Sequence, residues 1–269
     1  KPKILILDEP TSNLDYKSIA LKLIPFLQRA SDVSIDIQNK GPEIKIKEDN
    51  SPVTNGDIAV NEILTNGINE AQSGIPIISE ETVDLKKKNY LKDYWLIDPI
   101  DGTKEYIAGK DEFTLNVALI INKKPIIGLV GVPKKKRLFY SYGVNESYLI
   151  DGQKTKKLSC QKLSAKDEVK AVSSVHKPSD VILNKLKEFK VSSIKKMASS
   201  YKFCVIATGE FDIYAAKERA NEWDYAAGHA VAENAGAIIT TLDGKMFEYG
   251  KEDYRNPSLL ILRSKNLND

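Results

Sequence analysis

A single segment, DPIDGT at residues 98–103, constrains the fold of this chain most strongly. It follows the apolar run YWLI at residues 94–97, which is typical of a buried strand. The proline favours an extended backbone at Asp98, and the glycine permits a tight turn with positive φ. Thr103 can then cap a following helix. We therefore predict a rigid strand-to-turn segment that presents Asp98 and Asp101 beside a helix N-terminus, where a cation and a phosphate could be held together.

The composition restricts the metals that such a segment can bind. Among 269 residues there are 37 Asp and Glu but only two His and two Cys. A tetrahedral zinc site needs a full set of nitrogen or sulfur ligands, so we exclude zinc. Carboxylates suit hard cations such as Mg²⁺ or Ca²⁺. The cysteines, Cys160 and Cys204, can form one disulfide at most, and their scarcity favours a reducing compartment.

Charge and hydropathy exclude several other classes. A net charge of +3 is too small to indicate nucleic-acid binding through bulk electrostatics. The lysine runs at residues 86–88 and 134–136 are typical of solvated surface, with anion binding as the alternative. No apolar run approaches the ~20 residues of a membrane-spanning helix, and no signal peptide is visible. We expect a cytoplasmic protein without a nucleic-acid partner; peripheral inner-membrane association and the oligomeric state stay open.

Hydrophobic periodicity predicts a chain that begins as α+β and becomes α/β after about residue 160. Ser18 is a plausible N-cap for the first helix, inside which Pro25 would introduce a kink. Thr54 or Asn55 can cap the second helix. Helices are expected over residues 16–30, 55–68, 179–190, 199–208 and 224–235. Strands are expected over residues 44–47, 76–79, 94–97, 114–121, 125–132, 138–142, 147–150, 169–173, 191–194, 211–215, 238–240 and 259–262.

These patterns divide the chain into three parts. We predict an extension of open origin over residues 1–14, an N-terminal α+β metal-binding domain over 15–155 and a C-terminal α/β domain over 156–269. The first 15 residues, KPKILILDEPTSNLD, resemble the Walker B strand and D-loop of ABC-type ATPases. The chain contains neither a G-x-x-x-x-G-K-[ST] loop nor the ABC signature LSGGQ. An ATPase-related nucleotide-binding fragment is therefore an alternative that we do not favour.

Three further acidic positions lie at the ends of predicted elements. Asp57 lies in the first turn of a predicted helix, Glu80 follows a short predicted strand, and Asp224 begins an alanine-rich helix. Each of these acids alone is also typical of the first turn of a helix or of solvated surface, and does not by itself indicate a metal site. Together with residues 98–103 they indicate one convergent site for divalent cations and a phosphate.

In this set of motifs the chain resembles the inositol monophosphatase superfamily of Mg²⁺-dependent, lithium-sensitive phosphomonoesterases. The family pattern is an acid, then Glu-Glu, Asp-Pro-[Ile/Leu]-Asp-Gly-Thr, Trp-Asp and a pair of glycines. The matching positions are Asp57, Glu80-Glu81, residues 98–103, Trp223-Asp224 and Gly236-Ala237, the last departing at its second glycine. The resemblance extends from about Tyr16 over nearly the whole chain. It implies an α+β to α/β fold, layered as an αβαβα sandwich.

Within this family, four segments are most similar to the CysQ-type 3′(2′),5′-bisphosphate nucleotidases. They are NSPVT at 50–54, DGTKEY at 101–106, SSYKFC at 199–204 and WDYAAGHA at 223–230. Ala198 departs from the glycine that these nucleotidases usually have. The resemblance implies a hydrolase that converts adenosine 3′,5′-bisphosphate to AMP and phosphate, in support of sulfur assimilation. An inositol monophosphatase or a broad sugar phosphatase is the alternative.

The resemblance also implies a set of metal ligands. Glu80, Asp98 and the backbone carbonyl of Ile100 would bind one Mg²⁺. Asp98, Asp101 and Asp224 would bind a second. A third, looser ion would lean on Glu80.

Roles in catalysis and in phosphate binding are implied in the same way. Asp57 and Thr103 would orient and deprotonate the attacking water, and Glu80 is counted with them. The backbone N–H groups of Gly102 and Thr103, next to Asp101, would hold the phosphate.

The predicted substrate contacts come from the second half of the chain. Ser199, Ser200 and Lys202 would face the nucleotide or its second phosphate. His229 lies more than one helical turn after Asp224. It is a candidate substrate contact, with packing or a hydrogen bond within the helix as the alternative.

Overall fold

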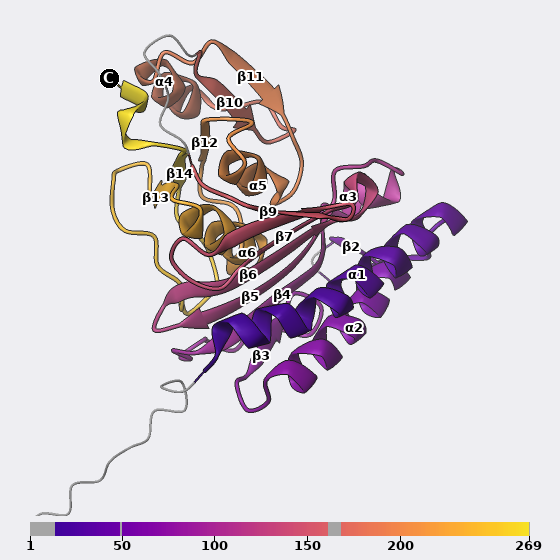
Figure 1. Ribbon diagram of the computed structural model, residues 1–269. Coiled ribbons are helices and arrows are strands. Elements are labelled where there is room, and N and C mark those ends of the chain that lie inside the picture. The colour runs from indigo at the N-terminus through magenta and orange to yellow at the C-terminus, as the bar shows by residue number, and fades with distance from the viewer. Residues whose placement is uncertain (1–13, 49, 161–167, 269) are drawn as a thin grey trace, which may run out of the picture.

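The computed structural model describes residues 14–48, 50–160 and 168–268, and these form five layers (Figure 1). Two long helices cover one face of a seven-stranded sheet, and two others lie between this sheet and a five-stranded one. A last helix packs on the far face of the second sheet. The helices of the layers are α1 (Tyr16–Lys40), α2 (Asn55–Ala71), α5 (Tyr201–Ala207), α6 (Glu222–Asn234) and α4 (Asp180–Glu188). The predicted αβαβα sandwich is confirmed.

The seven-stranded sheet follows the chain order from β3 to β9. Only β3 and β4 pair in parallel; each later pair is antiparallel, so the predicted meander is confirmed. The strand β9 was not predicted, because all its residues are exposed and show no alternation. The strands are β3 (Ile77–Ser79), β4 (Tyr94–Asp101), β5 (Thr114–Ile121), β6 (Lys124–Val132), β7 (Arg137–Ser141), β8 (Ser147–Asp151) and β9 (Lys154–Lys157).

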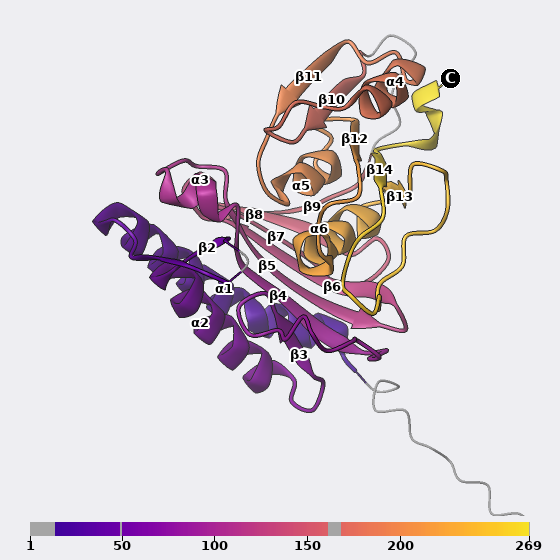
Figure 2. The ribbon, with the colours of Figure 1, turned by 180° about the vertical axis from the view of Figure 1, so that it is seen from behind.

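The five-stranded sheet has the order β11-β10-β12-β14-β13, and the view from behind shows it above the first sheet (Figure 2). Strand β10 pairs in parallel with β11 and β12, and β14 is antiparallel to its neighbours. Its strands are β10 (Lys170–Ser173), β11 (Ser193–Lys196), β12 (Ile213–Ala216), β13 (Ile238–Thr240) and β14 (Leu259–Leu262). The remaining elements are the hairpin β1 (Ile44–Ile46) and β2 (Pro52–Thr54), the helix α3 (Thr103–Ile107) and the short turns η1 (Pro133–Lys135) and η2 (Lys265–Asn268).

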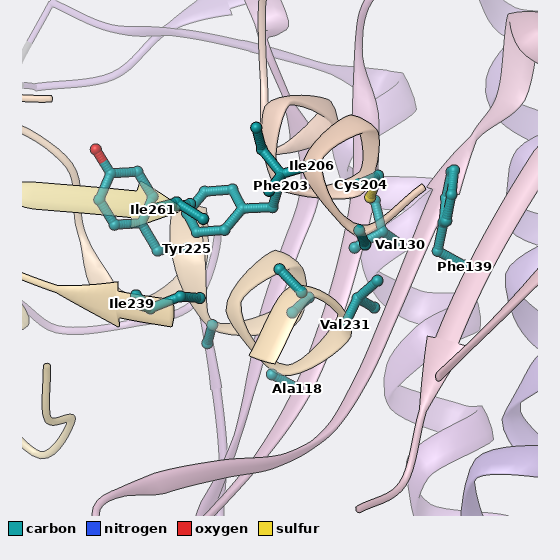
Figure 3. Packing of buried hydrophobic residues seen from close by; sticks show 14 of the residues in the cluster. Ala118, Val130, Phe139, Phe203, Cys204, Ile206, Tyr225, Val231, Ile239 and Ile261 are labelled. Atoms are coloured by element: carbon teal, nitrogen blue, oxygen red, sulfur yellow. The ribbon is translucent and has the colours of Figure 1, made fainter. Parts of the chain in front are cut away.

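Strand β4 separates two hydrophobic cores. Its side chains alternate between the faces of the sheet, so Trp95 and Ile97 pack towards α1 and α2 while Tyr94 and Leu96 pack towards α5 and α6. Figure 3 shows the second of these cores, in which residues of α5 and α6 fill the space between the two sheets. Cys204 is part of this core.

Helix α1 differs from its prediction at both ends. Asp15 is its N-cap instead of Ser18, since the Asp15 side chain accepts a hydrogen bond from the Ser18 N–H at 3.0 Å. The helix passes through Pro25 and continues to Lys40. Its last turns are fixed by Gln38, whose Nε2 donates to the Tyr106 carbonyl at 2.9 Å. Of the described helices, none is long and apolar enough to cross a membrane.

Candidate functional site

Strand β4 carries Asp98 to the centre of the site. Asp98 pairs with Asn116 of β5 and Asp101 pairs with Thr114, so the pairing shifts register between the two aspartates. Pro99 lies in this irregular stretch, where a residue without an N–H group is tolerated. Gly102 follows with φ = 94°, which only glycine adopts easily, and begins the turn into α3. The predicted strand-to-turn segment is therefore present.

Three carboxylates converge at the end of β4. Oxygen atoms of Glu80, Asp98 and Asp224 lie within 4.8 Å of one another. Glu80 follows β3, and Asp224 lies in the first turn of α6, where its Oδ2 accepts the Asn221 N–H at 2.7 Å. Elements from distant parts of the chain thus bring together three of the predicted metal ligands.

The electrostatics of this cluster are unfavourable without a cation. Burial, followed by the charge of Asp224, raises the pKa of Glu80 to about 8. Burial and the charge of Asp101 raise the pKa of Asp224 to about 7. Asp98 is 1% exposed, and its pKa is raised well above the usual range by burial and then by Glu80. Such a group of buried like charges is stable only when protonated or when a cation neutralises it.

The carboxylate ligands that the site offers fit Mg²⁺. Among the described residues, neither carboxylate oxygen of Asp98 has a hydrogen-bond partner, although both are buried. Buried carboxylate oxygens without donors, aimed at two further carboxylates, are the hard ligands that Mg²⁺ prefers. The chemistry of the site therefore supports the predicted dependence on a divalent cation.

Asp101 lies beside the cluster and is held by a different set of contacts. Its Oδ2 accepts a hydrogen bond from the Ser200 N–H, and Thr114 Oγ1 lies 3.5 Å away. Burial raises the pKa of Asp101, and the positive charge of Lys202 opposes this shift. Asp101 is thus near the other acids without being one of the three that share the 4.8 Å cluster.

Asp57 and Thr103, the predicted water-activating pair, have defined partners. Asp57 is buried at the start of α2, where its Oδ2 accepts hydrogen bonds from the Thr54 N–H and Oγ1, each at 2.7 Å. Burial raises the pKa of Asp57 to about 6. Thr103 does not cap α3 as predicted: Gly102 is the N-cap, and Thr103 Oγ1 donates to the Ile100 carbonyl at 3.1 Å. The Thr103 hydroxyl reaches the Ile100 carbonyl because Gly102, in its left-handed conformation, closes the turn.

A cavity of about 520 Å³ opens over the acids. Its lining includes Glu80, Asp101 and Asp224, the turn into α3 and several basic side chains. Ser199, Ser200 and Lys202, the predicted substrate residues, also line it. The basic lining residues are Lys104, His176, Lys177, Lys202, Lys217 and Arg219.

Lys202 is deeply buried for a lysine, with 6% of its surface exposed. Its ammonium donates to the Ser199 carbonyl and, at 3.4 Å, to the Met197 carbonyl, and it lies over the Tyr214 ring. Burial lowers the pKa of Lys202 to about 8, while Asp101 opposes this shift. Lys202 therefore places a largely buried positive charge at the cavity wall.

The predicted contact of His229 with the substrate stays a prediction. The ring is 2% exposed and is not among the described residues that line the cavity. Nδ1 lies 3.1 Å from Tyr249 Oη, and Nε2 lies 3.5 Å from the Glu233 carboxylate. These contacts favour the alternative, packing or a hydrogen bond within the helix, because the next turn of α6 supplies the Glu233 partner.

Several residues of the site were not predicted. Lys217 and Arg219 belong to no motif, but they immediately precede Trp223-Asp224, and this proximity is the signal that could have found them. Thr114 and Asn116 lie at the start of the otherwise apolar strand β5. Two polar residues at alternate positions of a buried strand indicate a shared polar partner on one face of the sheet.

Comparison with known proteins agrees with this geometry. The model of the inositol monophosphatase family matches residues 8–268, and the chain belongs to this family. Over 226 residues it is 35% identical to the 3′(2′),5′-bisphosphate nucleotidase CysQ of Escherichia coli strain K12, covering 82% of this chain and 89% of the relative. The CysQ of Buchnera aphidicola from Acyrthosiphon pisum is 33% identical over 242 residues, with coverages of 89% and 90%.

A solved structure supports the same assignment. The crystal structure of CysQ from Bacteroides thetaiotaomicron, a bacterial member of this family, matches with a TM-score of 0.79 at 29% identity. The match covers 94% of this chain and 100% of the other. Residues 1–13, which carry the Walker B-like sequence, lie outside the described residues. The ATPase resemblance is not borne out, since the family match already begins at residue 8.

Proposed function

We propose that this protein is a Mg²⁺-dependent 3′(2′),5′-bisphosphate nucleotidase that hydrolyses adenosine 3′,5′-bisphosphate to AMP and phosphate. The observation that carries the proposal is the cluster of Glu80, Asp98 and Asp224 beside a cavity that basic side chains also line. The similarity to proteins named as CysQ nucleotidases supports the choice of substrate.

The acidic residues of the site would hold the cations, and with them the phosphate to be released. Glu80, Asp98 and Asp224, with Asp101 and the Ile100 carbonyl, would be the ligands. Divalent cations bound there would lower the pKa of water and neutralise charge on the phosphoryl oxygens. The N–H groups of the turn into α3 would hold the phosphate as it approaches.

Asp57 is the proposed proton acceptor for the attacking water. A carboxylate with a pKa of about 6 is ionised at neutral pH and is a better base than an ordinary aspartate. Thr54 fixes one of its oxygens at 2.7 Å, so the orientation of the carboxylate is set before substrate binds. Thr103, at the start of α3, would orient the water.

The basic lining residues of the cavity would take the second phosphate. Lys177, Lys217 and Arg219 are exposed residues of this lining, and Ser199 also lines the cavity. Buried Lys202 adds to the positive potential. A substrate with two phosphates would use both the acids and these basic residues, whereas an inositol monophosphate would use only the acids.

A phosphate-release panel tests this proposal. The substrates are adenosine 3′,5′-bisphosphate, its phosphosulfate analogue, inositol 1-phosphate and fructose 1,6-bisphosphate, each with Mg²⁺ and with EDTA as the control. We expect the highest kcat/KM with the bisphosphate nucleotide and no release with EDTA. A preference for inositol 1-phosphate or the sugar bisphosphate would contradict the proposal.

Cytoplasmic location, peripheral membrane association and the oligomeric state stay predictions.

A further inference from the structure

Residues 197–202, here called the 197–202 turn, lead from β11 into the first turn of α5 and are joined directly to Asp101. The Ser200 N–H donates a hydrogen bond to Asp101 Oδ2, across a large separation in sequence. The predicted role of Ser200 was contact with the nucleotide. Its backbone N–H instead faces a predicted metal ligand.

The Ser200 hydroxyl is also committed to other protein groups. It donates to Asn116 Oδ1 at 2.7 Å and lies 2.9 Å from Thr114 Oγ1. Ser200 is 2% exposed, Thr114 0% and Asn116 1%. A buried hydroxyl with two protein partners has little capacity left for a ligand.

The two β5 residues stand opposite the two aspartates of the DPIDGT segment. Asn116 pairs across the sheet with Asp98, and Thr114 pairs with Asp101. Thr114 Oγ1 therefore lies between Ser200 Oγ, at 2.9 Å, and Asp101 Oδ2, at 3.5 Å. The side chains of Thr114 and Asn116 thus connect the 197–202 turn to the end of β4, where the pairing of β4 with β5 shifts register.

The shape of the turn is itself held in place. Ser199 has φ = 54°, a left-handed conformation that is uncommon for residues other than glycine. The Lys202 ammonium donates to the carbonyls of Ser199 and Met197, on both sides of this conformation. The turn therefore presents the Ser200 N–H in a fixed direction.

We propose that Ser200 and Thr114 are positioning residues that set the direction of the Asp101 carboxylate towards the cation site. The inference rests on the proposed function only in taking Asp101 as a metal ligand. Partners of a metal ligand fix its orientation, and their loss typically weakens metal affinity about 10-fold or more. Ser200 acts through Asp101, so its removal affects metal binding first.

The test compares Thr114→Val, which has the same shape without the hydroxyl, with Thr114→Ser, which keeps it. Ser200→Ala keeps the backbone N–H that donates to Asp101, and removes the hydroxyl that ties the 197–202 turn to Thr114 and Asn116. Mg²⁺ binding is measured by calorimetry without substrate, and KM and kcat are measured separately. We expect Thr114→Val and Ser200→Ala to weaken Mg²⁺ binding about 10-fold. Thr114→Ser should bind like the parent, and the KM for adenosine 3′,5′-bisphosphate at saturating Mg²⁺ should stay near that of the parent.

Three results would overturn the inference. Unchanged Mg²⁺ affinity in both variants would show that Asp101 needs no positioning. A raised KM with unchanged Mg²⁺ affinity would make Ser200 a substrate contact. Equal losses in Thr114→Val and Thr114→Ser would assign the effect to packing. Circular dichroism of the metal-free proteins shows which variants are folded. One folded variant, Thr114→Val or Ser200→Ala, is sufficient for the test. Because the binding experiment contains no substrate, it remains valid if the nucleotidase activity is absent.

Discussion

At the scale of single residues, the carboxylate of Asp98 is the group in the site that most needs a bound cation. It is buried beside Glu80 and Asp224, and neither oxygen accepts a hydrogen bond from the described part of the chain. Without a cation, its charge would destabilise the fold, because burial and like charges both oppose ionisation. The same arrangement makes it a strong ligand when a cation is present.

We expect Asp98→Asn to separate activity from stability. The amide has nearly the same shape but no charge, so kcat should fall at least about 100-fold through loss of a metal ligand. The Tm of the metal-free protein should rise, because repulsion from Glu80 and Asp224 is removed. Phosphate release and thermal unfolding with EDTA measure the two effects. Asp36→Asn, at an exposed ion pair, is the control and should change neither; near-normal turnover of Asp98→Asn would contradict the metal assignment.

The raised pKa values also predict a pH dependence. Glu80 and Asp224 have pKa values of about 8 and 7 in the fold, above the ordinary 4.5 and 3.8. The metal-free folded protein therefore retains protons that the unfolded chain releases, so its stability falls as the pH rises from about 4 to about 8. Mg²⁺ must displace these protons, and its affinity should increase over the same window.

Calorimetry in two buffers with different ionisation enthalpies measures this proton release directly. At pH 6.5 we expect Mg²⁺ binding to release protons and to be weaker than at pH 8. The Tm with EDTA should be higher at pH 5.5 than at pH 8. Binding with the same apparent enthalpy in both buffers would show that the acids are already ionised.

The acidic residues of the site could be predicted from the sequence, but the residues that position them could not. Asp57, Glu80, Asp98 and Asp224 lie at element ends, and position in an element is a local property that periodicity reveals. The partners of Ser200 are distant in sequence, and its contacts depend on how β5 and the 197–202 turn meet. Local patterns carry no information on such contacts, and the assignment of Ser200 to the substrate came from the family resemblance alone.

At the scale of elements, the position of α6 sets the place of Asp224. The helix crosses β6 at Gly128, where a Cβ atom would lie 2.4 Å from the Ala227 carbonyl oxygen and 2.7 Å from Ala230 Cβ. No side chain fits in this space without moving the helix. Glycine at this position therefore permits the close contact that brings the start of α6 to the end of β4.

We expect Gly128→Ala to destabilise the protein by about 1–3 kcal/mol through overpacking against backbone. It should also reduce turnover, because α6 carries Asp224. Urea unfolding and phosphate release measure the two effects. Gly131→Ala on the same strand is the matched control: its Cβ would lie 3.1 Å from Ser31 Oγ, the movable end of a side chain. Equal losses in the two variants would mean that the contact with α6 is unimportant.

The elements themselves show where pattern reading succeeds. Strands such as β5 and β13 were predicted at their observed bounds, because apolar runs define them. The end of α1 was placed too early because its later core-facing positions are Ser34 and Gln38, which are buried but polar. Gln38 is buried there because carbonyls around α3 accept its amide hydrogens, and this pairing exists only in the folded protein.

At the scale of the whole molecule, the two sheets share one core. Leu96 of β4 and Ile261 of β14 belong to the same buried cluster between the sheets. Glu222 of α6 is fully buried, accepts the Tyr94 hydroxyl at 2.6 Å and pairs with Lys251 at 3.0 Å. A core and a buried Tyr94–Glu222 hydrogen bond that join both halves favour a single cooperative unfolding transition.

The two tryptophans allow this prediction to be tested. Trp95 lies in the core against α1 and α2, and Trp223 lies in the core between the sheets. Trp95→Phe and Trp223→Phe each leave one fluorescent reporter. We expect both to give the same urea midpoint as circular dichroism within each variant. Separate midpoints would show that residues 15–155 and 156–269 unfold as independent domains.

Strand β4 links the fidelity of folding to the chemistry. It is held in register from both sides, in parallel by β3 and antiparallel by β5, and its alternate residues fill opposite cores. A slip by one residue would exchange Trp95 with Tyr94 and turn Asp98 away from Glu80 and Asp224. Misfolded chains of this kind would therefore be catalytically silent. Specific activity should thus report the fraction of molecules with the correct strand alignment, even in preparations that retain normal secondary-structure content.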